Sequence, residues 1–407
     1  MADIDPAKLG ARAETMIKAL APISAEPNRL VRLFLSPEHR RAADLVTQWM
    51  SEAGMAVTED ALGTLRGRIG EGPRLLIGSH LDSVADGGNY DGPLGVIAGI
   101  LAAAHFGGRP PVPIDVLAFG DEEGSRFPST LSSSAACAGV FDMETLRLAD
   151  RNGMTFADAL AAYGKNTGDI PKAAYKAGEA AAYVELHIEQ GPLLEAEKQP
   201  LGVVTGIVGQ SRFRVTVTGE AGHAGTVPMT LRRDALAGAA AMIMTVERIA
   251  KANVAASMVA TVGRIEALPG ATNIIPGTAT FTVDLRAMSD KLRHTTVATI
   301  QHEARGIAKA RNLAVAFEPF HDAEAAPCDA SLQDRLAAAI GDFGGRALRM
   351  PSGAGHDAQM MARLCPSAMM FVRCRAGISH NPAEYCAPAD MGMAVAALIR
   401  FIERFKL

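Results

Sequence analysis

Three apolar segments between residues 74 and 120 constrain the fold more than any other feature of this sequence. A short run at 74–78 precedes a longer one at 93–106, and another short run follows at 114–120. The short runs have the length of buried strands, and the long run has the length of a buried helix. Buried strands that alternate with a helix are typical of a parallel sheet covered by helices. We therefore expect an α/β domain built mainly on a parallel sheet.

Imidazoles and carboxylates recur just after predicted strand ends, where α/β sheets bind their ligands. The side chains concerned are His80, Asp82, Asp91, Glu122, Glu123, His187 and His380. The first loop, 78–95, suits either a metal ion or an acid–base pair. The recurrence in separate elements favours a metal with mixed nitrogen and oxygen ligands, such as Zn²⁺, Mn²⁺, Co²⁺ or Ni²⁺.

A different pattern begins near residue 210. Residues 212–219 and 278–285 alternate apolar and polar side chains, as half-exposed strands of an antiparallel sheet do. Further strands at 260–265 and 313–319 and helices at 233–250 and 290–309 complete a β-α-β-β-α-β order, which is ferredoxin-like. A chain of 407 residues also favours two domains. We predict one domain of residues 1–209 and 324–407 and an inserted α+β domain of residues 210–323.

Other helices and strands are expected on either side of this insertion. Residues 37–53 have helical spacing, with Ser36 as a capping residue and Pro37 in the first turn. Strands are predicted at 55–59, 65–69, 184–188 and 367–372, and further helices at 330–342 and 389–405.

Composition argues against several kinds of partner. Lys and Arg number 40 against 44 Asp and Glu, a net charge of −4, and the basic residues form no cluster that would suit nucleic acid. No stretch approaches the roughly 18 apolar residues of a membrane span, and the N-terminus lacks a signal-peptide pattern. The five cysteines have no CxxC spacing, which favours free thiols in a reducing compartment. We expect a cytoplasmic protein without a nucleic-acid or membrane partner.

Nine short motifs follow one another in an order that is similar to that of a known family. They read GSHLDSV, GGNYDGPLGV, FGDEEGSRFP, HIEQGP, GHAGTVPM, PGATNIIPG, DLR, SGAGHDA and GISHNPAE. The series resembles the amidase, hydantoinase/carbamoylase family of two-metal hydrolases, within the aminoacylase/carboxypeptidase superfamily. This family includes N-carbamoyl-L-amino-acid amidohydrolases, β-ureidopropionases and allantoate amidohydrolases.

The resemblance implies two divalent metal ions per subunit, most often Zn²⁺ or Mn²⁺. His80 and His187 would hold one ion, and Glu123 and His380 the other. Asp91 would bridge the two ions, as a carboxylate between two cations about 3.5–4 Å apart can.

The resemblance also implies how the substrate is bound and activated. Glu122 would be the general base, and Asp82 would orient the ring of His80. His223 would stabilise the oxyanion and is often supplied by the neighbouring subunit. The implied substrate contacts are Gln190, His223, Asn273, Arg286 and His356. The inserted domain would act as a lid and as the contact of a homodimer.

We predict a metal-dependent amidohydrolase that cleaves the ureido C–N bond of a small carboxylate. General likeness slightly favours allantoate over N-carbamoyl-L-amino acids and N-carbamoyl-β-alanine. A dipeptidase or aminoacylase on the same scaffold is a remoter alternative, because those branches usually have a carboxylate where His187 stands. The intact Glu122 argues against a metal-binding protein without activity.

One departure from the family pattern concerns specificity. After FPSTL, relatives usually carry a Gly-Ser-Arg-like or Gly-Ser-Lys-like segment, whereas Ala135 stands at the basic position here. If that position contacts substrate, specificity differs from that of the better-known members.

Overall fold

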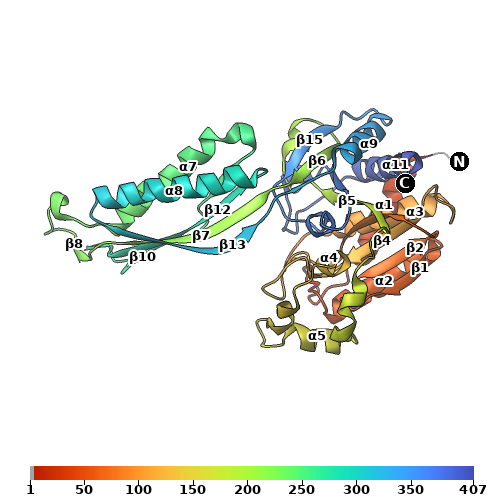
Figure 1. The fold of residues 1–407 in the computed structure, drawn as a ribbon, viewed down its shortest axis with the longest axis horizontal. Coiled ribbons are helices and arrows are strands. Elements are labelled where there is room, and N and C mark those ends of the chain that lie inside the picture. Colours follow the sequence, from red (N-terminus) through yellow and green to blue (C-terminus); the bar gives the residue numbers. More distant parts are fainter. Residues whose placement is uncertain (1–3) are drawn as a thin grey trace. The chain divides into compact units, whose positions relative to one another are not determined.

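The computed structural model describes residues 4–407, and these form two compact units (Figure 1). One unit combines Met1–Gly206 with Pro327–Leu407, and the other is Ile207–Ala326. These limits differ by three residues from the predicted ones at 209/210 and 323/324. Each unit has its own sheet and its own apolar core.

The first unit is built on a sheet with a parallel centre. The order of its strands is β1-β2-β4-β3-β5-β16-β6-β14, with β15 paired to β6. The four central strands β4, β3, β5 and β16 are parallel, whereas β1, β2 and β6 join antiparallel on the two flanks. The strands are β1 (Ala56–Glu59), β2 (Leu65–Ile69), β3 (Arg74–His80), β4 (Ile114–Phe119), β5 (Ala180–Ile188), β6 (Leu201–Ile207), β14 (Ala326–Pro327), β15 (Leu348–Ser352) and β16 (Ser367–Val372). The predicted α/β class with a mostly parallel sheet is confirmed.

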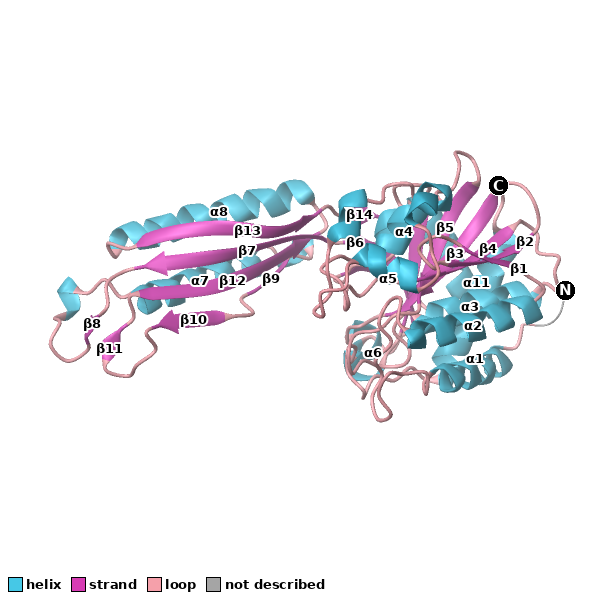
Figure 2. Cartoon of the chain, turned by 90° about the horizontal axis from the view of Figure 1, so that it is seen from below, coloured by secondary structure: helices cyan, strands magenta, loops and turns pink. Residues whose placement is uncertain are grey.

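Helices cover this sheet (Figure 2). They are α1 (Pro6–Leu20), α2 (Pro37–Glu52), α3 (Pro93–His105), α4 (Ser132–Cys137), α5 (Phe156–Ala162), α6 (Leu193–Ala196), α9 (Ala330–Gly341), α10 (Ala358–Met361) and α11 (Pro388–Arg404). Helices α1, α3 and α11 share one core with alternate residues of the central strands. A Cβ added to Gly10 would lie 1.9 Å from the Pro388 carbonyl oxygen, so the glycine lets α1 and α11 approach backbone to backbone.

Capping explains where two of these helices begin. Ser36 accepts a hydrogen bond from the His39 N–H at the start of α2, and Pro37 occupies the first turn, as predicted. Helix α1 was not predicted, although Asp5 caps it in the same way by accepting from the Ala7 and Lys8 N–H groups. The sequence therefore contained the same capping signal for the start of α1 as for the start of α2.

The second unit is a five-stranded antiparallel sheet with α7 and α8 on one face (Figure 1). The main strands run in the order β10-β12-β7-β13, and β9 also pairs with β12. The elements are β7 (Gly209–Thr218), β8 (Gly222–His223), α7 (Ala235–Ala252), β9 (Val259–Thr261), β10 (Ile265–Leu268), β11 (Ile274–Ile275), β12 (Thr278–Ala287), α8 (Asp290–Ala310) and β13 (Ala314–Ala323). The long elements follow the expected β-α-β-β-α-β order. The single strand predicted at 260–265 is wrong, because the chain leaves the ladder around Gly263 and forms two short strands instead.

Two further sequence expectations concern helices and thiols. Over the described residues, no helix is both long and apolar enough to cross a membrane. All five cysteines are free thiols.

Candidate metal centre

Two histidines reach the site from neighbouring parallel strands. His80 is the last residue of β3, and His187 lies near the end of β5, which pairs with β3. Leu186 and Ile188 pack into the core that contains α3, so strand alternation turns His187 to the opposite face of the sheet. The two imidazoles are 0% and 1% exposed.

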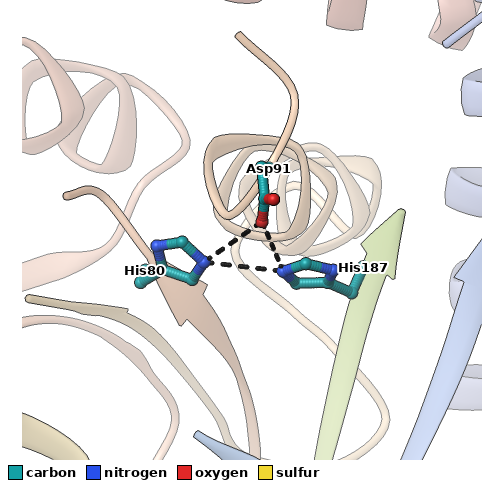
Figure 3. A group of neighbouring side chains, drawn as sticks. All are labelled: His80, Asp91 and His187. Atoms are coloured by element: carbon teal, nitrogen blue, oxygen red, sulfur yellow. Dashed lines mark hydrogen bonds and ion pairs between the residues drawn. The ribbon is translucent and has the colours of Figure 1, made fainter. Parts of the chain in front are cut away.

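Asp91 completes a first group of possible ligands (Figure 3). The Nε2 atoms of His80 and His187 are 3.5 Å apart, and they lie 3.5 Å and 3.1 Å from Asp91 Oδ1. Asp91 stands in the loop before α3, which returns to the ends of β3 and β5. Gly92 follows with a φ of 84°, and a Cβ there would lie 2.5 Å from the His80 ring. Only glycine therefore lets this loop pack against the imidazole.

The hydrogen bonds of the two rings show that this group fits a cation. His187 Nδ1 lies 2.9 Å from the Ile188 carbonyl oxygen, and His80 Nδ1 lies 3.1 Å from the Asp82 carbonyl oxygen. Carbonyl oxygens only accept, so each neutral ring has its proton on Nδ1 and its lone pair on Nε2. Two ring lone pairs and a carboxylate oxygen thus converge on one point, and a divalent cation would satisfy all three.

A second group uses the other oxygen of Asp91. His380 Nε2 lies 3.4 Å from Asp91 Oδ2 and 3.3 Å from Glu123 Oε2. Asp91 therefore faces one group with Oδ1 and the other with Oδ2. A carboxylate that presents its two oxygens in this way is suited to bridge two ions. These two sets contain the five residues that the family resemblance implied as ligands.

A third set, Glu185, His187 and His356, is less suitable for an ion. It shares His187, whose Nε2 already faces Asp91. The Glu185 carboxylate accepts hydrogen bonds from the Ala358 N–H at 2.8 Å and from the Tyr183 hydroxyl at 3.1 Å. We therefore consider the first two sets as the candidate centre.

Asp82 connects the ends of two strands. Its Oδ1 lies 3.3 Å from His80 Nδ1, and its two oxygens accept the N–H groups of Glu122 and Glu123, each at 3.2 Å. The carboxylate is 1% exposed. It therefore both orients a candidate ligand and holds the backbone that carries Glu122 and Glu123.

Glu122 lies beside the two sets without belonging to either. Its Oε2 is 3.9 Å from His80 Nε2, and its side chain is 11% exposed. Burial, together with the negative charge of Glu123, raises the pKa of Glu122 well above its ordinary value. The group thus has the position and the proton affinity of a general base.

Two polar residues contact Asp91 in a way that the sequence did not indicate. The Ser379 hydroxyl donates to Asp91 Oδ2 at 2.6 Å, and the Gln190 amide donates to the same oxygen at 2.8 Å. Gln190 was expected to contact substrate, and in this structure it contacts the central carboxylate. Gln190 and His380 have φ values of 57° and 54°, in the left-handed region that residues other than glycine rarely adopt. Such outliers are frequent at functional sites.

The serine-rich segment of α4 braces the strand end that precedes Glu122. The Ser132 hydroxyl donates to Asp121 Oδ2 at 2.5 Å, and Ser133 Oγ accepts the Gly120 N–H at 3.2 Å. Ala135, where the family resemblance led us to expect a basic residue, is 9% exposed in the same helix.

His356 lies against a candidate ligand. Its ring centroid is 4.4 Å from that of His187, in an edge-on arrangement, and its Nε2 is 2.9 Å from Ser352 Oγ. The ring is 0% exposed, and its Nδ1 has no hydrogen-bond partner among the described residues.

The other expected substrate contacts lie in the second unit, at a separate two-stranded ribbon and in β12 of the main sheet. His223 pairs with Ile274 in the β8–β11 ribbon, and the Asn273 carbonyl accepts the Ala224 N–H, so His223 and Asn273 are neighbours. Arg286 lies eight residues beyond the start of β12, which at about 3.4 Å per residue is about 27 Å along the strand.

The Arg286 guanidinium is held by a carboxylate on its own strand. Its Nε and Nη2 donate to Asp284 Oδ1 and Oδ2 at 2.9 Å and 2.8 Å. This fork is the geometry in which arginine also binds a free carboxylate. His223 is exposed, and its Nδ1 accepts the Gly225 N–H at 3.1 Å.

Comparison with known proteins identifies the family of this chain. The model of peptidase family M20/M25/M40 matches residues 76–404. The chain belongs to this family. A crystal structure of an amidase of the hydantoinase/carbamoylase family from Burkholderia multivorans aligns with 97% of each chain, at a TM-score of 0.90 and 34% identity. The resemblance stated from the motifs is thereby confirmed.

Two relatives within the M20/M25/M40 family bear more specific names. Allantoate deiminase of Arabidopsis thaliana is 40% identical over 440 residues, which cover 98% of this chain and 83% of the relative. The N-carbamoyl-L-amino acid amidohydrolase of Geobacillus stearothermophilus is 39% identical over 397 residues, which cover 96% of this chain and 97% of the relative.

Proposed function

We propose that this protein is a metal-dependent amidohydrolase that cleaves the ureido C–N bond of allantoate. The observation that carries the proposal is the position of Asp91, which presents one oxygen to His80 and His187 and the other to Glu123 and His380. N-carbamoyl-L-amino acids are the second candidate substrates, because relatives named for the two activities are 40% and 39% identical to this chain.

The proposed centre holds two divalent ions on the two groups that share Asp91. Its mixed nitrogen and oxygen donors favour Zn²⁺ or Mn²⁺, with Co²⁺ and Ni²⁺ as further candidates. Such ions polarise a carbonyl and lower the pKa of a water.

Glu122 supplies the proton transfers of the proposed reaction. Its carboxylate would take a proton from the attacking water and deliver it to the leaving nitrogen. Hydrolysis of a terminal ureido group consumes one water and yields ammonia, carbon dioxide and the free amine. The low exposure of Glu122 keeps bulk water from competing for that proton.

Substrate recognition is proposed to use two subunits. Arg286 would bind the substrate carboxylate through its guanidinium by exchanging Asp284 for the substrate, and His223 and Asn273 would bind the polar carbonyl end. Within one chain, about 27 Å of β12 lie between Arg286 and the end of the strand that leads back to Asn273, too far for one small substrate to touch all three. A homodimer in which His223 and Asn273 come from the partner would satisfy both requirements.

The second unit is proposed as the lid and the dimer contact. It exposes several large apolar side chains; Met229, Leu231 and Met244 are 76%, 72% and 61% exposed. Exposed apolar side chains that gather in one region favour an interface. We further propose a cytoplasmic location, which the five free thiols support.

A substrate panel tests the proposal. Ammonia release should be measured after loading with Mn²⁺ or Zn²⁺, using allantoate, N-carbamoyl-β-alanine, several N-carbamoyl-L-amino acids and a dipeptide. We expect the highest kcat/KM for allantoate. Turnover of the dipeptide alone would refute the ureido specificity, and a preference for a carbamoyl amino acid would select the second candidate.

A further inference from the structure

A buried glutamate outside the two ligand groups binds the main chain of Asp91. Glu384 is 5% exposed, and its Oε1 accepts the N–H groups of Tyr90 at 2.8 Å and Asp91 at 3.1 Å. Nearly 300 residues separate the two partners in sequence, so this contact is a feature of the tertiary structure alone. Two N–H groups that share one carboxylate oxygen define both the position and the direction of the backbone at Asp91.

The opposing loop is shaped to receive this side chain. A Cβ added to Gly88 would lie 2.2 Å from Glu384 Cδ and 2.3 Å from its Oε1. Gly88 does not have a left-handed φ, so the lack of a side chain is needed for the close approach and not for the backbone conformation.

The segment that carries Glu384 is itself well ordered by local bonds. The Asn381 side chain accepts the Ala383 N–H at 2.9 Å, and the Asn381 carbonyl accepts the Glu384 N–H at 3.0 Å. Asx turns of this kind hold a loop in one conformation.

The same segment also contacts the Asp91 side chain. The Ser379 hydroxyl donates to Asp91 Oδ2, and His380 Nε2 lies 3.4 Å from it. Residues 379–384 thus hold the main chain of Asp91 through Glu384 and its carboxylate through Ser379 and His380.

We propose that Glu384 is a positioning residue for the metal centre, which fixes the backbone of Asp91 so that its two oxygens face the two ion sites. The inference rests on the metal centre proposed above and adds a residue that is not itself a ligand. Asp91 is common to both groups, so a displacement of its backbone affects both ions together. Loss of a terminal ligand, such as His380, would instead affect mainly one ion.

The first test is the Glu384→Ala variant, with zinc binding as the readout. Metal-free protein should be titrated with Zn²⁺ by calorimetry at a temperature well below the unfolding transition. We expect both ions to bind about 10- to 100-fold more weakly, the range found for residues that orient ligands. Wild-type affinity for both ions would overturn the proposal.

A matched control separates this role from a general loss of stability. The Asp150 carboxylate also accepts two main-chain N–H groups, from Asn152 at 2.9 Å and Met154 at 3.1 Å, and it bonds Arg126. Asp150→Ala should lower the melting temperature and leave zinc affinity unchanged. An equal loss of affinity in both variants would make Glu384 merely structural.

A second variant perturbs the contact and leaves Glu384 in place. Gly88→Ala inserts a methyl group where the glutamate lies, so it should reproduce the zinc phenotype of Glu384→Ala. The two substitutions act on one contact. The double variant should therefore bind zinc no more weakly than whichever single variant has the lower zinc affinity. Additive effects, or wild-type affinity in Gly88→Ala, would contradict the proposal.

The conservative variant Glu384→Gln tests the hydrogen bonds themselves. Its carbonyl oxygen can still accept both N–H groups, so we expect zinc affinity within about threefold of the wild type. A larger loss would show that the negative charge acts in place of the bonds. All these readouts use zinc alone, so they stand even if the substrate panel rejects allantoate.

Discussion

Asp82→Ala is the substitution that most directly tests how the strand ends build the centre. The carboxylate contacts His80 Nδ1 at 3.3 Å and accepts the N–H groups of Glu122 and Glu123, each at 3.2 Å. Alanine removes all three contacts and leaves every candidate ligand and Glu122 in the chain. The variant therefore separates the orientation of the ligands from their presence.

The expected losses follow from these contacts. Each N–H group that loses its acceptor in a buried place costs about 1–3 kcal/mol, so two of them lower the free energy of unfolding by about 2–6 kcal/mol. Because the Glu122 and Glu123 N–H groups are only partly buried, we expect a value near the lower end. Separately, the His80 ring loses the carboxylate at 3.3 Å but keeps its hydrogen bond to the main-chain carbonyl of residue 82, so zinc affinity should fall by about tenfold, the lower end of the range for orienting residues.

The assay combines urea unfolding of metal-free protein, followed by the fluorescence of Trp49, the only tryptophan, with zinc calorimetry. Asp115→Ala is the matched control. Asp115 is 0% exposed near the start of β4, at the opposite sheet edge, and it bonds Arg74 and Tyr175. The control should lose stability and keep its zinc affinity. If Asp82→Ala binds zinc as tightly as the wild type, the orienting role is refuted.

Three further predictions concern the base, the buried histidine and the glycine beside the site. Glu122→Gln should keep two ions per chain and lose about 10²- to 10⁴-fold in kcat, as steady-state assays and metal analysis would show; full activity would exclude it as the base. Burial lowers the pKa of His39 to about 4, whereas the pKa of a histidine in the unfolded chain is about 6.5. Between pH 4 and pH 6.5 the unfolded state therefore binds more protons than the folded state. The free energy of unfolding should thus fall by about 2 kcal/mol from this group between pH 7.5 and pH 5, and urea midpoints should show a smaller fall in His39→Gln. Gly92→Ala places a methyl group against the His80 ring at a φ of 84°, so zinc affinity should drop at least about tenfold, and an unchanged titration would contradict the packing argument.

The local pattern of apolar residues was sufficient to predict many of the helices and strands. The predicted helix at 290–309 is α8, Asp290–Ala310, and the predicted strand at 367–372 is β16. The helix has a hydrophobic period and the strand is a short continuous apolar run, and both signals depend only on neighbours in sequence. The antiparallel strand β6, which pairs with β16, β14 and β15, was missed, and the segment at 260–265 was predicted wrongly, because antiparallel and interrupted strands depend on partners distant in sequence.

The sequence by itself determined the kind of chemistry and the residues available for it. The ordered motifs named His80, Asp91, Glu123, His187 and His380 as ligands, and these side chains converge in the structure. Residue type after parallel strand ends indicated a metal with mixed nitrogen and oxygen donors, and the family resemblance implied which five residues hold the two ions.

Only the tertiary structure decided how these groups are held. It showed that Asp91 divides its oxygens between two groups, that Gln190 and Ser379 donate to it, and that Glu384 binds its backbone. Apart from the contact of Asp91 with His80, these contacts join segments about 100 to 300 residues apart, so no sequence period or local spacing indicates them. The separation of His223 from Arg286 likewise depends on the tertiary structure, because His223 lies in the separate β8–β11 ribbon and Arg286 lies near the far end of β12.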